Sequence, residues 1–361
     1  MVKFLKNTVL VLIFSAVLFA LIEVIVRQFF PQTVRTTYLV GETLGIKDPV
    51  TGHLNRPNTH AAVTAPEFSV EYIVDERGFR NASLDSRPSS EATATKVLLV
   101  GDSFVFGAAN HFDDIWPELL ANRFKQEGLD VEVINAGVPG FDTSQQVLYL
   151  ERLFETYQPD IVLLTFLPND LFANRPIQNV DGQDQARGDA RAVVQTGGSK
   201  KSSFQSVTLL KRMMMGTDAA YRRLYLMTPR KAFFENPPSE KMETKADTTK
   251  DILMRAKQFT SQHGADFVVL SVPQLFQVLQ KASGEVVPDV NPDLPDQMFE
   301  EFSSENEIDW IATLPVLAQN YAENKAELYY RFDGHLNAEG NRVVADIAYD
   351  ALEPLVSNYS N

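Results

Sequence analysis

The middle of the chain alternates short apolar runs with segments of helical periodicity. Residues 96–100, 131–135 and 161–166 read as strands, whereas 113–127 and 143–157 carry apolar residues at helical spacing behind plausible N-caps. Strands that alternate with helices are typical of a parallel sheet covered on both faces. The sequence therefore predicts an α/β fold, a three-layer α/β/α sandwich with a central parallel sheet.

The same alternation continues towards the C-terminus. Helical spacing is expected at 249–263, 294–303 and 337–352, and a strand at 267–272. A chain of 361 residues is long enough to bury a sizeable core and to carry additions to it.

The three central strands all run into polar or glycine-containing loops. The first ends in Gly101-Asp102-Ser103, the second in a loop with Gly137 and Gly140, and the third in Leu167-Pro168-Asn169-Asp170. Open α/β folds keep their sites at the carboxyl ends of their strands. We therefore expect these loops to meet at one edge of the sheet.

A serine in this position suggests nucleophilic chemistry if a base is available. A hydroxyl is a poor nucleophile at neutral pH and needs an imidazole, itself oriented by a third group. Asp333-Gly334-His335 can supply both. The G-x-S-x-G elbow of α/β-hydrolases is absent, since Val105 stands where that motif has glycine. An ordinary β-turn at Gly-Asp-Ser is the alternative interpretation.

At these four blocks the chain resembles the SGNH hydrolases, also called the GDSL esterase and lipase family, whose sheet is flavodoxin-like. The resemblance implies that Ser103 is the nucleophile, His335 the base and Asp333 the acid of the triad. Such an enzyme needs no cofactor and no metal.

The same resemblance implies an oxyanion hole. Its donors would be the Ser103 N–H, the Gly140 N–H and the Asn169 side-chain amide, with Gly137 as the alternative glycine. Preorganised donors of this kind are usually the largest single catalytic contribution.

Two positions depart from the family pattern. The usual D-x-x-H spacing would require an acid at Phe332, but the nearest acid is Asp333, and Leu167 stands where the family has glycine. D-x-H spacing also occurs in SGNH-like enzymes of exopolysaccharide acetylation. The role of Asp333 is therefore open at this stage.

The N-terminus predicts membrane attachment. Residues 8–26 are almost wholly apolar, broken only by Glu23, and are long enough to cross a bilayer. Lys3 and Lys6 precede them, which favours a cytoplasmic tail at 1–7. We expect a single-pass protein of the bacterial inner membrane with a periplasmic or extracellular catalytic domain. A cleaved signal peptide is the alternative, although no A-x-A site follows.

The remaining segments suggest a domain organisation. Residues 27–95 read as a stem with a small β element at 68–74, and residues 96–170 together with 249–361 as the SGNH domain. Residues 171–248 would be an insertion, with a lid as one interpretation.

The insertion has two parts of different composition. It begins with a polar stretch through residue 198, which suggests a mobile loop. Residues 207–215 and 221–227 are basic, rich in Met and aromatic residues, and predict amphipathic helices. A lid, an acyl-chain groove, a membrane-surface contact and a helical pair packed on the domain are all compatible with that pattern.

Composition excludes several other classes. A net charge of −14 and a pI near 4.9 argue against nucleic acid, which demands clustered Lys and Arg. Without cysteine the chain has neither a Cys nucleophile nor Cys-ligated zinc, and its scattered Asp residues lack metal-site spacing.

The predicted function is hydrolysis of acyl esters, with O-acetyl or short acyl groups, by a membrane-anchored serine esterase. The substrate would be an acyl ester, with an acylated glycan as one candidate. One alternative is an O-acyltransferase acting on an envelope or extracellular polysaccharide. Another is a catalytically silent protein that binds glycan or scaffolds a complex. The sequence leaves oligomeric state open.

Overall fold

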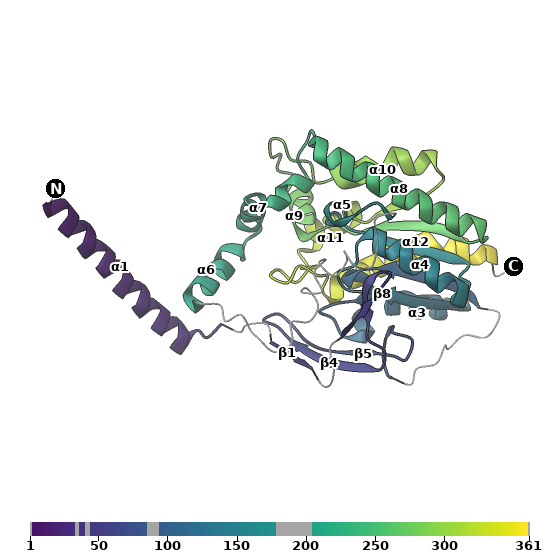
Figure 1. The fold of residues 1–361 in the computed structure, drawn as a ribbon, viewed down its shortest axis with the longest axis horizontal. Coiled ribbons are helices and arrows are strands. Elements are labelled where there is room, and N and C mark those ends of the chain that lie inside the picture. Colours follow the sequence, from purple (N-terminus) through teal and green to yellow (C-terminus); the bar gives the residue numbers. More distant parts are fainter. Residues whose placement is uncertain (1, 33–35, 40–43, 85–93, 178–203, 360–361) are drawn as a thin grey trace.

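The computed structural model describes residues 2–32, 36–39, 44–84, 94–177 and 204–359. Its centre is a five-stranded parallel sheet (Figure 1). In chain order the strands are β7 (Thr95–Gly101), β8 (Val131–Gly137), β9 (Ile161–Phe166), β10 (Asp266–Ser271) and β11 (Asp309–Ala312).

The strand order across the sheet is β11-β10-β9-β7-β8. Counted along the chain this is the doubly wound order 2-1-3-4-5, whose direction of winding reverses between β7 and β9. Ligands of such sheets bind in the crevice beyond the carboxyl ends of the strands at this reversal. The fold therefore places the ends of β7 and β9 where a site is expected.

Helices cover both faces of the sheet and confirm the predicted α/β/α sandwich. Leu98 and Val100 of β7 point into one core, whereas Val97 and Leu99 point into the other, and all four are fully buried. Helices α4 (Thr143–Tyr157), α8 (Glu240–Gln262) and α10 (Leu294–Glu305) pack in the first core. Helices α3 (Trp116–Gln126), α9 (Leu275–Ser283), α11 (Leu314–Asn324) and α12 (Ala338–Tyr359) pack in the second.

The structure extends the predicted pattern in its C-terminal half. Strand β11 and helices α9 and α11 have no predicted counterpart, and β11 is a four-residue edge strand with too few residues for a clear period. Helix α8 begins at Glu240, well before the predicted start at 249, because the Ser239 side chain caps it by accepting the Met242 N–H.

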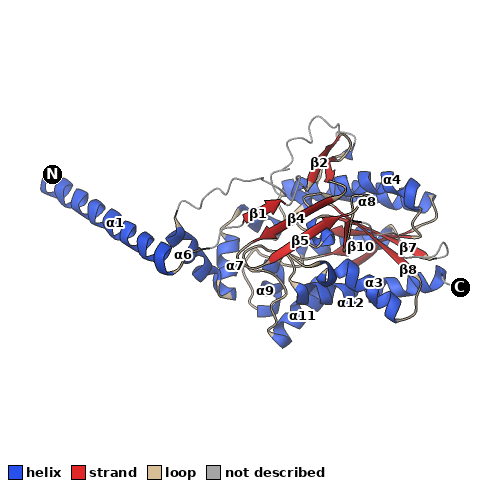
Figure 2. Ribbon diagram, turned by 90° about the horizontal axis from the view of Figure 1, so that it is seen from below, coloured by secondary structure: helices blue, strands red, loops and turns tan. Residues whose placement is uncertain are grey.

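Two small antiparallel units precede the sheet (Figure 2). A four-stranded sheet, ordered β1-β4-β5-β6, contains the β element predicted at 68–74, and a hairpin joins β2 to β3. The strands are β1 (Thr36–Leu39), β2 (Gly45–Asp48), β3 (Gly52–Asn55), β4 (Thr59–Thr64), β5 (Ser69–Val74) and β6 (Arg80–Asn81). The inner face of this sheet packs on Phe106 and Ala109, so it lies against the start of the α/β unit.

The N-terminal segment is the helix α1 (Val2–Phe29), which projects from the rest of the chain (Figure 1). Its portion Lys6–Phe29 is long and apolar enough to cross a membrane, and the most apolar stretch of 18 residues within it has a mean hydropathy of 3.0. The predicted span 8–26 lies inside it.

The insertion is helical where the structure describes it. The short helix α5 (Asp170–Ala173) follows β9, and the predicted polar loop is described only as far as residue 177. The rest of that loop, 178–203, lies outside the described residues. Helices α6 (Gln205–Met215) and α7 (Asp218–Leu226) and the 3-10 turn η4 (Pro229–Phe233) then lead back to α8.

Candidate active site

Ser103 sits at a tight junction between strand and helix. Strand β7 ends at Gly101, and Asp102 caps the short helix α2 (Ser103–Phe106) by accepting the Phe104 N–H at 2.8 Å. A Cβ on Gly101 would lie 2.1 Å from Val105 Cγ2, so glycine alone lets the helix fold back onto the strand. Ser103 is thereby raised at the carboxyl end of β7.

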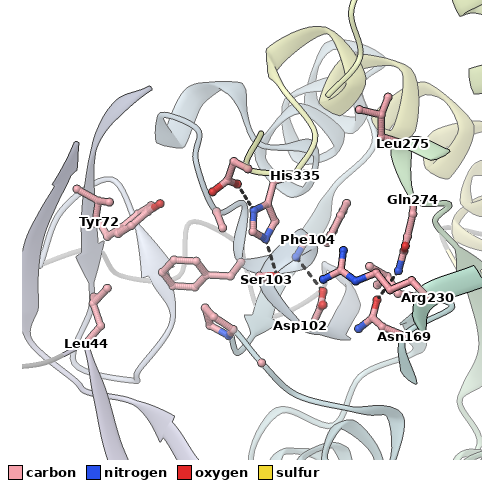
Figure 3. Close-up of a pocket in the computed structure, with 18 of the residues that line it drawn as sticks. Leu44, Tyr72, Asp102, Ser103, Phe104, Asn169, Arg230, Gln274, Leu275 and His335 are labelled. Carbon is pink, nitrogen blue, oxygen red and sulfur yellow. Dashed lines mark hydrogen bonds and ion pairs between the residues drawn. The ribbon is translucent and has the colours of Figure 1, made fainter. Parts of the chain in front are cut away.

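His335 meets Ser103 from the other end of the chain. His335 Nε2 lies 2.8 Å from Ser103 Oγ, and His335 Nδ1 is hydrogen-bonded to Asp333 Oδ1 (Figure 3). The intervening Gly334 has a φ of +92°, a left-handed conformation that folds the loop so that an acid two residues away reaches the ring. The short D-x-H spacing is thus compatible with an Asp-His-Ser chain of contacts.

The loop that carries Asp333 is held by the N-terminal sheet. Glu67, between β4 and β5, accepts the backbone N–H groups of Phe332 at 3.0 Å and Asp333 at 2.9 Å. Burial raises the pKa of Glu67, and the hydrogen bonds from Asp333 and Phe332 oppose that rise. Glu67 thereby fixes the backbone directly before His335.

The structure distinguishes between the two candidate glycines. Gly140 lines the cavity in front of Ser103 with a φ of +87°. Gly137 instead ends β8, its N–H donates to Asn135 Oδ1 at 3.0 Å, and a Cβ there would lie 2.2 Å from the Phe106 nitrogen. Gly137 is therefore a close-packing position, and Gly140 is the glycine near Ser103.

Asn169 is oriented through a side-chain relay. The Tyr225 hydroxyl donates to Gln274 Oε1. Gln274 Nε2 in turn donates to Asn169 Oδ1 at 3.4 Å (Figure 3). Because the Asn169 oxygen is engaged in this way, its amide nitrogen is the group that can donate to a ligand.

These residues surround one cavity of about 380 Å³. Its lining combines the polar groups described above with apolar and aromatic side chains from the N-terminal β units, α2, the loop after β9 and α7. Among them are Leu44, Val63, Tyr72, Phe106, Leu167, Tyr221 and Tyr225. The volume is at the small end of ligand pockets, which commonly measure about 300–1,000 Å³.

Comparison with known families bears on this geometry. The sequence model of the GDSL-like Lipase/Acylhydrolase family matches residues 99–343, which is more than half of the chain and includes every candidate site residue. The chain belongs to this family. The resemblance to SGNH hydrolases drawn from the four sequence blocks is therefore confirmed.

Individual relatives of this GDSL-like protein are distant. An arylesterase of Vibrio mimicus is 32% identical over 82 residues, which cover 23% of this chain and 41% of that protein. Among solved structures, the acetyl xylan esterase AlAXEase is 16% identical with a TM-score of 0.44, over 71% of this chain and 99% of that one. The psychrotrophic esterase EstA from Pseudoalteromonas sp. is 14% identical with a TM-score of 0.42, over 73% and 100%.

Two buried carboxyl groups of this GDSL-like protein, Asp102 and Asp170, lie next to Ser103 and Asn169 in the chain. Burial raises the pKa of Asp102 to about 6, against the opposing effects of the Phe104 N–H and of His335. Burial also raises the pKa of Asp170, and the nearby carboxylates of Asp102 and Asp142 raise it further. Asp170 accepts from the Thr143 hydroxyl at 3.1 Å and the Leu167 N–H at 3.3 Å, so it holds the loop between β9 and Asn169.

Leu167, the second departure from the family pattern, is buried and lines the cavity. Its side chain adds apolar surface there, and its backbone N–H is bound to Asp170. The position is thus used for packing.

Sequence reasoning missed Glu67, which holds the loop beside the cavity, and Arg230, which lines it. Both carry no local motif and come from segments remote from the four blocks. Tyr221 and Tyr225 line the cavity from the segment 221–227, for which an acyl-chain groove was one of the interpretations. Gln274 had a usable signal, because it follows closely on β10 at the carboxyl edge of the sheet.

The site contains no evident metal centre among the residues that the structure describes. No group of three or more His, Asp and Glu side chains lies in a position to hold an ion within 2–32, 36–39, 44–84, 94–177 and 204–359.

Proposed function

We propose that this protein is a serine esterase that uses Ser103 as nucleophile, His335 as general base and Asp333 as the orienting acid. The supporting observation is the 2.8 Å contact between His335 Nε2 and Ser103 Oγ, with Nδ1 on Asp333. A carboxylate can only accept hydrogen bonds, so His335 Nδ1 carries the ring proton. His335 Nε2 is then free to accept a proton from the serine hydroxyl. Ser103 Oγ then attacks the ester carbonyl, and His335 returns the proton to the departing alkoxide.

The developing oxyanion would be bound by three donors. Ser103 opens α2, so its N–H is one of the helix donors without an intrahelical acceptor, and Gly140 and Asn169 face the same cavity. Water then attacks the acyl-enzyme, with His335 again accepting the proton, and releases the acid.

The substrate proposed is an ester of an acetyl or other short acyl group, with an acylated glycan as one candidate carrier. A cavity of about 380 Å³, closed in part by Leu44, Val63 and Tyr72, suits a short acyl chain beside the nucleophile. Longer chains would require the walls to move.

Ester turnover by the full chain tests the assignment. Wild type should hydrolyse p-nitrophenyl acetate faster than long-chain esters, and Ser103→Ala and His335→Ala should each lose that turnover. A fluorophosphonate should label wild type and fail to label Ser103→Ala. Turnover by Ser103→Ala at the wild-type rate would refute the nucleophile.

Transfer of the acyl group to a polysaccharide hydroxyl is the second candidate. It is favoured by the D-x-H arrangement of Asp333 and His335, which is shared with SGNH-like enzymes of exopolysaccharide acetylation. The two activities use the same acyl-enzyme and differ in what intercepts it. Mass spectrometry of an oligosaccharide acceptor incubated with enzyme and an activated acetyl ester separates them, because only a transferase adds acetyl groups to the sugar.

A silent glycan-binding or scaffolding protein is the third candidate. The 2.8 Å distance between Ser103 Oγ and His335 Nε2 counts against it, because it leaves the serine proton within reach of a general base. Absence of both turnover and fluorophosphonate labelling would favour this candidate.

We also propose that α1 anchors the protein in the bacterial inner membrane. The support is the length and hydropathy of Lys6–Phe29 together with Lys3 and Lys6 at its start, which favour a cytoplasmic N-terminus. The catalytic domain would then be periplasmic. We expect the protein to stay in the membrane fraction after alkaline carbonate extraction. We also expect protease added to spheroplasts to digest the catalytic domain. A soluble periplasmic product that lacks the first residues would instead indicate a cleaved signal.

A further inference from the structure

Helix α6 exposes its apolar side. Val207, Leu210 and Met214 recur at helical spacing along one stripe, and all three are exposed, as is Met213 at 69%. A surface helix of a globular protein normally turns such a stripe towards the core. Contiguous exposed apolar surface of this kind marks an interaction site.

The charge on α6 is of one sign. Residues 205–215 contain Lys211 and Arg212 and no acidic residue. An apolar stripe with basic residues beside it is typical of a helix that lies in the interface of an anionic bilayer.

The N-terminus of α6 is joined to α1 by a buried carboxylate. Glu23 Oε1 accepts the Gln205 N–H at 2.9 Å, and Glu23 Oε2 accepts both the N–H and the hydroxyl of Ser206, at 2.9 and 2.6 Å. Arg27 Nε donates to the same carboxylate at 2.7 Å. A carboxylate in an apolar span is costly unless it is paired, and here a helix N-terminus and an arginine pair it.

The contact also fixes where α6 lies along α1. Glu23 is six residues before the end of α1, about 9 Å along the helix axis at 1.5 Å per residue. The rings of Phe19 and Phe204 meet at 5.0 Å one turn closer to the N-terminus. Figures 1 and 2 show α6 beside this end of α1, between it and the α/β unit.

We propose that α6 is a membrane-interface helix whose stripe of Val207, Leu210, Met213 and Met214 enters the outer headgroup region of the bilayer that α1 crosses. The argument for lipid as the occupant is continuity, because the exposed apolar surface of α6 adjoins that of α1. This inference rests on the proposed membrane anchoring.

The interface helix bears directly on the catalytic cavity. Helix α7 follows α6 and supplies Tyr221 and Tyr225 to the cavity wall. In addition, the guanidinium of Arg212 in α6 lies 5.8 Å from the ring centre of Phe332, the residue before Asp333. A bilayer contact at α6 therefore holds this wall of the cavity at the membrane surface. The substrate class that follows is an ester presented at that surface, carried by a lipid or by a glycan emerging there.

Because the chain has no cysteine, single cysteines can report on this contact without background. Full-length Leu210→Cys and Met214→Cys are labelled with bimane and placed in nanodiscs of phosphatidylcholine and phosphatidylglycerol that contain a nitroxide-labelled lipid. Phe14→Cys in α1 is the positive control. Gln126→Cys, exposed at the end of α3 on the side of the α/β unit away from α1 (Figure 1), is the negative control. We expect loss of emission at 14, 210 and 214 relative to nitroxide-free discs, and none at 126.

Each outcome bears on a different statement. Quenching at 14 but not at 210 or 214 overturns the interface helix and leaves the anchor intact, whereas absence of quenching at 14 overturns the anchor and the inference with it. A blue shift at 214 that depends on protein concentration and not on nitroxide lipid identifies a second copy of the chain as the occupant and overturns the proposal. Glu23→Gln should weaken quenching at 210 and spare it at 14.

Discussion

The Glu67 carboxylate accepts the backbone N–H of Asp333 at 2.9 Å, so the small N-terminal sheet holds the loop of the proposed base. The sheet precedes the α/β unit in sequence, yet it supplies an acceptor to the last of the four blocks. Residues 36–81 thus do more than space the domain from α1.

Glu67→Gln tests whether this contact positions His335. Glutamine keeps one oxygen as an acceptor but replaces the other carboxylate oxygen with an NH₂ group. Because this group cannot accept from the backbone N–H donors that it faces, the loop should loosen. We expect kcat to fall about tenfold with little change in KM, as for loss of one hydrogen bond to a charged group. Because burial raises the pKa of Glu67, its ionisation contributes to the acid limb of kcat/KM, and that limb should become shallower in the variant.

The matched control for Glu67 is Glu71→Gln on the same sheet, an exposed residue that pairs with His60. It should leave the pH profile unchanged. An unaltered acid limb in both variants would remove Glu67 from the mechanism.

Asp333→Asn tests the short D-x-H arrangement. The amide can no longer accept from His335 Nδ1 while keeping the required tautomer, and comparable substitutions in serine hydrolases lower kcat by about 10⁴-fold. The melting temperature should change little, since the side chain is isosteric. Activity within a few-fold of wild type would show that another group orients the ring.

Asn169→Ala tests the proposed oxyanion donor. Loss of one such donor costs about 10²–10³-fold in kcat, with KM nearly unchanged, because the donor acts on the transition state. Gln274→Leu removes the side chain that holds the Asn169 oxygen and should give a smaller loss in the same direction. Equal KM and kcat in all three proteins would exclude both residues from catalysis.

Gly140→Ala and Gly128→Ala form a matched pair, because both glycines have positive φ, +87° and +77°. A Cβ should cost each variant about 1 kcal/mol of stability through backbone strain. Only Gly140 lines the cavity, so only Gly140→Ala should also lose turnover. Urea unfolding and ester kinetics on both proteins give the comparison, and equal turnover would favour another donor.

Asp102→Asn should change how stability depends on pH. Burial raises the folded-state pKa of Asp102 to about 6, above its ordinary value of 3.8, so the folded state binds this proton more tightly than the unfolded state. The contribution of Asp102 to the free energy of unfolding therefore falls as pH rises from about 4 to 6, by up to about 3 kcal/mol. The variant lacks that loss, so its melting temperature relative to wild type should be higher at pH 8 than at pH 4.

The control for this effect is Gln126→Ala, an exposed side chain that carries no titratable group. Its difference from wild type should be the same at both pH values. A pH-independent difference for Asp102→Asn as well would mean that folding does not raise the pKa of this carboxyl.

Local patterns were enough to predict the core architecture and the four blocks. Continuous apolar runs and helical spacing depend on neighbouring residues, and the carboxyl ends of parallel strands necessarily share an edge. Ser103 and Asn169 therefore come together once the sheet forms, and the sequence already contained the motif of His335.

Only the tertiary structure decided which residues support that site and which way the insertion faces. Gly137 and Gly140 look alike in sequence, but one packs against α2 and the other lines the cavity. Glu67 and Gln274 act through contacts with remote segments, which no local period encodes. The amphipathic pattern of α6 is the same whether its apolar stripe meets protein or lipid, and only its packing against Glu23 leaves that stripe exposed beside α1.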